Sequence, residues 1–258
     1  FFTSHSFERA ATAAQLAVLS FETTPIHGIS CLWKLKRADG ESSGALAGGT
    51  SLKAKLDEEV RLGITTDFFY DRYRMRAEET SAWLDAQLAA LSAAGYRLGG
   101  YGAAAKGMVL LHFMLGRGGA HAAARSLEFV FDDAPMKQGT YCPGTTIPVR
   151  PTRSLESVFT ADDKPLALVI FAWNFWAELS GNMQKLLAAA PPTRSGRPRV
   201  VLAVLPFPTP RVVTLAGDTV AQMHYQSAQI DAAYRGWVRA AGARRAVLLI
   251  RSPDALAL

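Results

Sequence analysis

Apolar residues in the first third of the chain recur mainly every three to four positions, which is the spacing of one face of a helix. This spacing predicts helices over residues 4–16, 51–62 and 66–94. The stretches 17–23 and 30–37 are instead short apolar runs separated by turn residues, so they predict two strands joined by a tight turn. This part of the chain is therefore expected to hold a helix, a β-hairpin and two further helices.

The pattern changes after residue 95, where short apolar runs alternate with helical periodicity. The strand-like runs are 96–102, 127–133, 166–172, 199–206, 211–216 and 245–251, and the helical segments are 104–115, 174–190 and 219–241. Strands that are apolar throughout and separated by helices are typical of a parallel sheet covered on both faces. The fold class predicted for residues 96–258 is therefore α/β, with an open parallel sheet.

Composition and charge narrow the classes of function. Hydrophobic residues make up 49% of the chain, and 28 Lys and Arg against 22 Asp and Glu give a net charge of +6. The basic residues are scattered and do not interleave with aromatic ones, so we expect no nucleic-acid partner, whereas a mildly basic surface suits small anionic ligands. Asn174 interrupts the longest apolar run, so we also expect no membrane partner.

The cysteines and histidines give no sign of a metal site. Cys31 and Cys142 lie far apart and form no C-x-x-C pair, which predicts neither structural zinc nor a disulfide framework and favours a reducing, cytoplasmic location. Metal-ligand spacing is also missing among His5, His121 and His224. We therefore expect no metal in this chain.

The glycine-rich stretch after the predicted strand 96–102 is the strongest signal of a ligand site. Gly100, Gly102 and Ala105 match G-x-G-x-x-[GA] between a strand and a helix, where backbone N–H groups and the charge of Lys106 can meet an anion. Asp132 ends the next strand, where a dinucleotide-binding fold contacts a ribose hydroxyl. The glycines are also compatible with a tight structural turn, and Asp132 with a side chain that caps the segment after it. The pattern alone leaves a NAD(P)-dependent oxidoreductase, a nucleotide-binding module and a plain turn open.

Three blocks of the chain resemble a known family. The blocks are GYGAAAKGMVLL (100–111), DDAPMKQGTYCPGTTIPV (132–149) and FAWNFWAEL (171–179). In order and spacing they resemble the C-terminal domain of the SAM-dependent sugar C-methyltransferases, which methylate a ring carbon of nucleotide-linked deoxy-keto sugars. PIHGIS (25–30) resembles a further block of that family, with Ile29 in place of its second glycine. The resemblance extends over residues 1–210.

The resemblance implies a division into domains. The family has an N-terminal zinc-binding domain, a SAM-binding Rossmann domain and a Rossmann-like C-terminal domain, and the sugar nucleotide lies between the last two. Residues 1–37 would be the end of the SAM domain, 38–50 a linker, 51–95 connecting helices and 96–258 the C-terminal domain. The chain does not begin with Met, which favours its interpretation as part of a longer protein. SAM and zinc would then be bound upstream, with no cofactor in this chain.

The resemblance also indicates which residues meet the substrate. The candidates for binding the sugar nucleotide are Tyr101, Gly102, Ala103, Ala104, Lys106, Gly107, Asp132, Lys137, Gly144, Thr145, Trp173 and Asn174. His27, in the PIHGIS block, is the candidate for a catalytic role, and none of the other residues is a convincing base. The chain is therefore expected to bind and position the sugar nucleotide within a C-methyltransferase and to be inactive alone. The alternatives are a stand-alone nucleotide- or nucleotide-sugar-binding module, or a NAD(P)-dependent oxidoreductase.

Overall fold

A computed structural model describes residues 2–24, 30–38, 49–116 and 119–223. The predicted turn that contains His27 lies outside the described residues, as do most of the linker 38–50 and the predicted strand 245–251. The boundaries at residues 37, 50 and 95 between the predicted domains stay predictions.

The predicted helix and β-hairpin at the start of the chain are confirmed. Helix α1 (Ser4–Ala13) precedes strands β1 (Leu16–Thr24) and β2 (Ser30–Arg37), which form an antiparallel two-stranded sheet. Helix α2 (Gly49–Arg61) packs on them, because Leu52 and Leu56 share a cluster with Val18 and Phe21 of β1. The apolar face of α2 is therefore buried against the hairpin that precedes it in the chain.

A carboxylate of α2 also holds the start of α1. Glu59 is 4% exposed, and its oxygens accept the backbone N–H groups of Ser4, at 2.7 Å, and His5, at 3.1 Å. The Nδ1 of His5 lies 2.9 Å from the same carboxylate. Because the first N–H groups of a helix have no partner within the helix, Glu59 satisfies donors that α1 leaves open.

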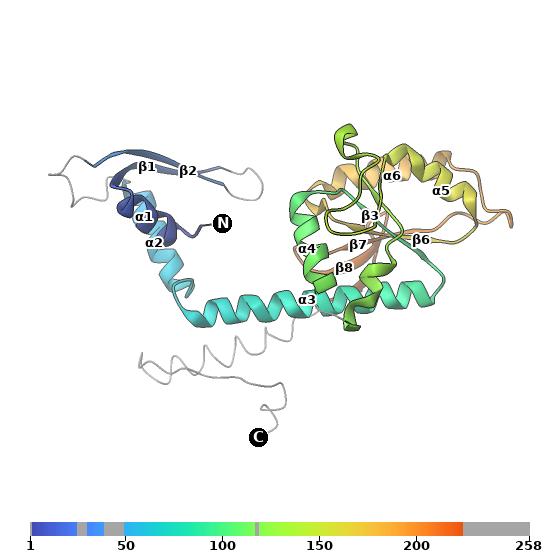
Figure 1. Cartoon of the computed structure of the whole chain (residues 1–258), viewed down its shortest axis with the longest axis horizontal. Helices are drawn as coiled ribbons and strands as arrows, with labels where there is room; N and C mark the ends of the chain where they lie inside the picture. Colours follow the sequence, from blue (N-terminus) through green and yellow to red (C-terminus); the bar gives the residue numbers. More distant parts are fainter. Residues whose placement is uncertain (1, 25–29, 39–48, 117–118, 224–258) are drawn as a thin grey trace, which may run out of the picture. The chain divides into compact units, whose positions relative to one another are not determined.

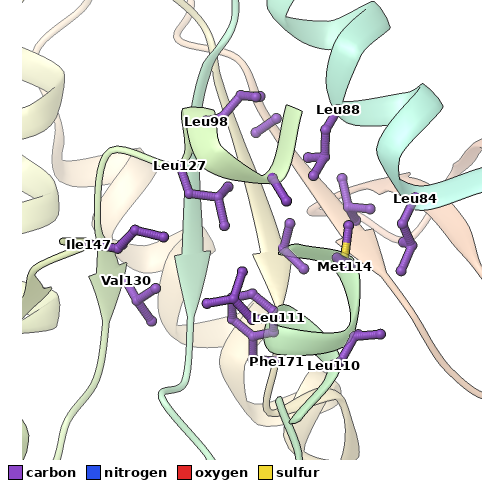
Figure 2. Close-up of a cluster of buried hydrophobic side chains, with 14 of the residues drawn as sticks. Leu84, Leu88, Leu98, Leu110, Leu111, Met114, Leu127, Val130, Ile147 and Phe171 are labelled. Carbon is purple, nitrogen blue, oxygen red and sulfur yellow. The ribbon is translucent and has the colours of Figure 1, made fainter. Parts of the chain in front are cut away.

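The long predicted helix before the α/β domain is confirmed as α3 (Asp67–Ala93), with Thr66 as its N-cap. Gly63 and Gly95, which flank it, have φ angles of 75° and 86°, a region that glycine enters without strain. Leu84 and Leu88 of α3 are fully buried and point towards Leu111 and Met114 of α4 (Ala105–Gly116) (Figure 2). The second half of α3 therefore belongs to the core of the α/β domain.

The α/β domain is built on one seven-stranded sheet with the order β5-β4-β3-β6-β7-β8-β9. The strands are β3 (Arg97–Tyr101), β4 (Val130–Phe131), β5 (Val149–Arg150), β6 (Leu166–Ile170), β7 (Val201–Leu205), β8 (Arg211–Thr214) and β9 (Thr219–Gln222). Within this order, neighbouring strands from β5 through β4, β3 and β6 to β7 are parallel. The helices between them are α4, α5 (Leu155–Ala161) and α6 (Trp176–Ala189), with short 3-10 turns η1 (Gly119–Ser126), η2 (Pro135–Lys137), η3 (Thr152–Ser154) and η4 (Trp173–Phe175).

The sheet is covered on both faces, as its apolar strands predict. Helices α3 and α4 lie on one side of the sheet and α5 and α6 on the other (Figure 1). One cluster of buried side chains joins the sheet to α3 and α4, and a second joins it to α5 and α6. Every residue of β6 and β7 is buried, so these strands have no solvent face and need no polar alternation. The predicted Rossmann-like α/β fold is confirmed.

Two expectations about the end of the sheet are wrong. Strands β8 and β9 are antiparallel to their neighbours, so the sheet is not wholly parallel. The segment between β7 and β8 is too short for a helical crossover, and it can only return the chain beside β7 in the opposite direction. Residues 219–222, predicted as the start of a helix, form β9 because they pair with β8. The rest of that predicted helix lies almost wholly outside the described residues.

The strand order changes direction at β3. From β3 the chain runs through α4 to β4 and β5 on one side, and α5 then carries it back to β6 on the other side of β3. In open α/β sheets, ligands bind at the carboxyl ends of the strands at such a reversal. The loops that follow β3 and β6 are therefore the place to look for a site.

Candidate functional site at the carboxyl ends of β3 and β6

The turn after β3 is held against the segment that follows β6. Gly102 has a φ of 83°, and a Cβ there would lie 2.4 Å from the Cβ of Ala172. A Cβ on Gly107 would lie 2.4 Å from the Cβ of Phe171. Glycine is required at both positions because neighbouring segments approach so closely. Packing alone therefore accounts for these glycines, and they are not evidence for a ligand. Evidence for a ligand must come from the groups around them.

The first turn of α4 presents unpaired N–H groups at this point. The N–H of Gly102 donates to the carbonyl of Phe131 at 2.7 Å, and that of Ala104 donates to Gly102. Those of Ala105, Lys106 and Gly107 have no acceptor among the described residues, as the geometry of a helix start dictates. Such N–H groups, together with the helix dipole, favour an anion.

Lys106, in the first turn of α4, and Trp173, at the start of η4, join the segments that follow β3 and β6. The Lys106 Nζ lies 4.4 Å from the centre of the Trp173 ring, a cation–π geometry. Partial burial lowers the pKa of Lys106 below its usual range. Trp173 also contacts Phe207, which follows β7, with ring centres 4.8 Å apart. Asn174 is exposed beside Trp173 in η4.

The structure thus brings together the predicted site residues that follow β3 and β6. These are Gly102, Ala103, Ala104, Lys106, Gly107, Trp173 and Asn174. Phe207 was not predicted, although its place directly after a buried strand was a signal that could have found it.

Asp132 and Lys137 are engaged with each other. The Asp132 side chain is 9% exposed, and its Oδ2 lies 3.0 Å from the Nζ of Lys137, while its Oδ1 accepts the N–H of Ala134 at 2.9 Å. Lys137 also donates to the carbonyl of Ala103 at 3.1 Å. The pair therefore ties the end of β4 to the turn after β3. Direct contact of either residue with a ligand stays a prediction.

Tyr101 belongs to a second hydrogen-bonded cluster, with Asp133 and Thr152, at the carboxyl ends of the strands. Its hydroxyl donates to the Oδ2 of Asp133 at 3.1 Å, and the Thr152 hydroxyl donates to the Oδ1 of Asp133. Burial raises the pKa of Tyr101 to about 12, so its hydroxyl remains a donor at neutral pH. Sequence reasoning missed Asp133 and Thr152 as site residues, because their proximity depends on the pairing of β3, β4 and β5.

Gly144 and Thr145 lie in a different place. They line a pocket of about 440 Å³ with Leu115, Arg125, Thr146 and Ile147. A Cβ on Gly144 would lie 2.9 Å from the His112 ring, in the middle of α4. The pocket borders the last turn of α4, whereas Lys106 lies in its first turn. The structure therefore does not place Gly144 and Thr145 with Lys106 and Trp173.

Neither a metal site nor a membrane span is seen in the described ranges. There, no three His, Cys, Asp or Glu side chains form a group that could hold a metal ion. The described helices include none that is both long and apolar enough to cross a membrane.

Comparison with known proteins gives an independent result. A family model described as the C-methyltransferase C-terminal domain matches residues 25–191 of the 258. The chain is also similar to the C-methyltransferase NovU of Streptomyces niveus, with 28% identity over 201 residues. That alignment covers 77% of this chain and 41% of NovU, so the chain spans about two fifths of the length of this curated relative. The matched range includes the turn after β3, the Asp132–Lys137 pair and Trp173.

Proposed function

The chain belongs to the C-methyltransferase C-terminal domain family, and from that premise we propose that it is the substrate-holding part of a SAM-dependent C-methyltransferase. The substrate we propose is a nucleotide-linked deoxy-keto sugar. The name of NovU supports the reaction class, and the resemblance of the three sequence blocks supports the sugar nucleotide.

The observation that carries the proposal is the junction of Lys106 and Trp173 at the reversal of the sheet. The N–H groups of Ala105 to Gly107 and the Lys106 ammonium offer a diphosphate several donors and one positive charge. The partly exposed rings of Trp173 and Phe207 add aromatic side chains against which a planar or ring-shaped group could pack. A nucleoside diphosphate linked to a sugar carries both kinds of group.

The same residues suit a diphosphate better than SAM, because they supply positive charge, whereas SAM carries a sulfonium cation and no phosphate. Zinc is likewise not assigned to the described residues, which include no suitable group of ligands. Following the family resemblance, we propose that SAM and zinc bind in regions of the complete enzyme outside this chain.

In the reaction, SAM supplies the methyl group to a carbon beside the keto group of the sugar. That carbon must first lose a proton, and the resulting enolate must be aligned with the methyl donor. The contribution of this chain is to bind the diphosphate, to fix the orientation of the attached sugar and to exclude alternative orientations. We assign no residue of the junction as the base.

A binding experiment tests the proposal. Calorimetry with the 258-residue chain compares uridine diphosphate, thymidine diphosphate, SAM and NADH as ligands. We expect one of the diphosphates to bind at a single site and SAM and NADH to bind far more weakly. A 1:1 complex with SAM would overturn the assignment of SAM to another region. Tighter binding of NADH than of either diphosphate would favour an oxidoreductase.

A second experiment separates the enzyme from a stand-alone binding module. Transfer of a labelled methyl group from SAM to a sugar nucleotide is measured for the complete gene product and for the 258-residue chain. We expect transfer by the former and none by the latter. Diphosphate binding without methyl transfer by either one would favour a binding module.

A further inference from the structure

The Asp133 carboxylate stands at the carboxyl edge of the sheet between two hydroxyl donors. The Tyr101 hydroxyl, from the end of β3, lies 3.1 Å from its Oδ2, and the Thr152 hydroxyl, which follows β5, donates to its Oδ1. The two hydroxyl oxygens lie 3.2 Å from each other. Three neighbouring strands therefore contribute to the position of one carboxylate.

The residues that hold this carboxylate are buried or half-buried, whereas the carboxylate itself is exposed. Tyr101 is 2% exposed and Thr152 is half-buried, whereas Asp133 is exposed. An ionised carboxylate has about four acceptor positions, and Tyr101 and Thr152 occupy two of them. No other donor among the described residues hydrogen-bonds this exposed carboxylate. Asp133 is therefore an acceptor whose orientation is set before any ligand arrives.

Asp133 lies next to the turn after β3, where we propose that the diphosphate binds. Tyr101 pairs in register with Phe131, and the N–H of Gly102 donates to Phe131, so Asp133 follows the strand that borders this turn. In nucleotide-binding α/β folds, a carboxylate at the end of that second strand accepts a ribose hydroxyl. Asp132 was predicted for this role, but it is buried, and Lys137 and Ala134 engage its two oxygens.

We propose that Asp133, positioned by Tyr101 and Thr152, accepts a hydrogen bond from a pentose hydroxyl of the nucleoside diphosphate. This inference rests on the proposed function, because it requires the phosphates to lie at the start of α4. It deepens that function by assigning the site a requirement for a free hydroxyl on the pentose. A phosphate group on that hydroxyl would meet the charge of Asp133 and be rejected.

The test compares ligands and variants of the 258-residue chain by calorimetry. The ligands are whichever of uridine and thymidine diphosphate binds more tightly, its analogue without pentose 2′- and 3′-hydroxyls, and inorganic pyrophosphate. The variants are Asp133→Asn and, as a matched control on the exposed face of α2, Asp57→Asn. Thermal unfolding verifies that each variant is folded.

We expect the unmodified chain to bind the nucleotide at least about tenfold more tightly than its dideoxy analogue, since hydrogen bonds to charged groups are among the stronger ones. Asp133→Asn should remove most of that difference and leave pyrophosphate binding unchanged, and Asp57→Asn should change neither. The ligand comparison in the unmodified chain serves as the test if Asp133→Asn does not fold.

Two results would overturn the inference while leaving the proposed function intact. One is equal affinity of the unmodified chain for the nucleotide and the dideoxy analogue. The other is a difference between these ligands that persists in folded Asp133→Asn. Failure of the unmodified chain to bind either nucleoside diphosphate would instead overturn the proposed function, and this inference with it.

Discussion

The Nζ of Lys106 lies 4.4 Å from the centre of the Trp173 indole ring. Lys106 lies in the first turn of α4, which follows β3, and Trp173 begins η4, which follows β6, so their contact lies where the strand order of the sheet reverses. The lysine charge is thus held beside the unpaired N–H groups of α4. This arrangement places a fixed cation at the N-terminus of a helix.

Replacement of Lys106 by Met should weaken binding of the nucleoside diphosphate by about tenfold or more. The substitution keeps the aliphatic stem and removes one charge-assisted contact, worth about 1.5–3 kcal/mol when it is shielded from water. Calorimetry measures the affinity, with Lys185→Met on the exposed side of α6 as the control. An unchanged affinity together with a lower melting temperature would show that Lys106 only stabilises the domain.

Replacement of Lys137 by Met should destabilise the α/β domain. The change leaves the buried Asp132 carboxylate without its cation and the carbonyl of Ala103 without a donor. We expect a loss of about 1–3 kcal/mol in the free energy of unfolding, because a buried polar group left unpaired is costly. Urea denaturation measures it. If stability is retained and only diphosphate affinity falls, Lys137 is a direct ligand contact.

Replacement of Gly102 by Ala should lower stability by more than 1 kcal/mol. An alanine there must adopt a φ of 83° and place its Cβ 2.4 Å from that of Ala172, so the turn after β3 must move. Gly181→Ala is the matched control, because it lies inside α6 with nothing within 4 Å of the added Cβ. That variant should be about 0.5–1 kcal/mol more stable. Equal melting temperatures for the two variants would contradict the packing described for Gly102.

The contact between α1 and α2 should weaken in acid. Burial of Glu59 opposes ionisation, but the N–H groups of Ser4 and His5 and the His5 ring outweigh it and leave the pKa of Glu59 below its usual 4.5. A carboxyl with a depressed pKa in the folded state adds stability above the unfolded pKa and loses that stability as the pH falls through the folded value. The stabilisation should therefore be complete near neutrality and disappear below about pH 4.5.

Hydrogen exchange of peptides from residues 4–24, corrected for intrinsic rates, measures this effect. Protection should fall between pH 5 and pH 3 in the unmodified chain, whereas Glu59→Gln should be less protected at pH 7 and change little with pH. A fall of the same size in both proteins would assign the pH dependence to another group.

Much of the architecture could be predicted because it depends on local pattern. The spacing of apolar residues predicted α3, and the uninterrupted apolar runs of β6 and β7 predicted a sheet covered on both faces. The G-x-G turn, Lys106 and Trp173 could be found because they directly follow predicted strands, which is where α/β folds place their ligands.

Tertiary structure alone decided which polar groups remain available to a ligand. Asp132 and Asp133 are adjacent in the sequence, yet the first is buried against Lys137 and the second is exposed between Tyr101 and Thr152. Pairing of β8 with β9 likewise overrode the helical pattern of residues 219–222, and the path of α4 placed Gly144 beside His112 rather than beside Lys106. The physical reason is the same in each case. Local pattern determines which element forms, but hydrogen bonds and packing between residues far apart in the sequence determine what each side chain meets.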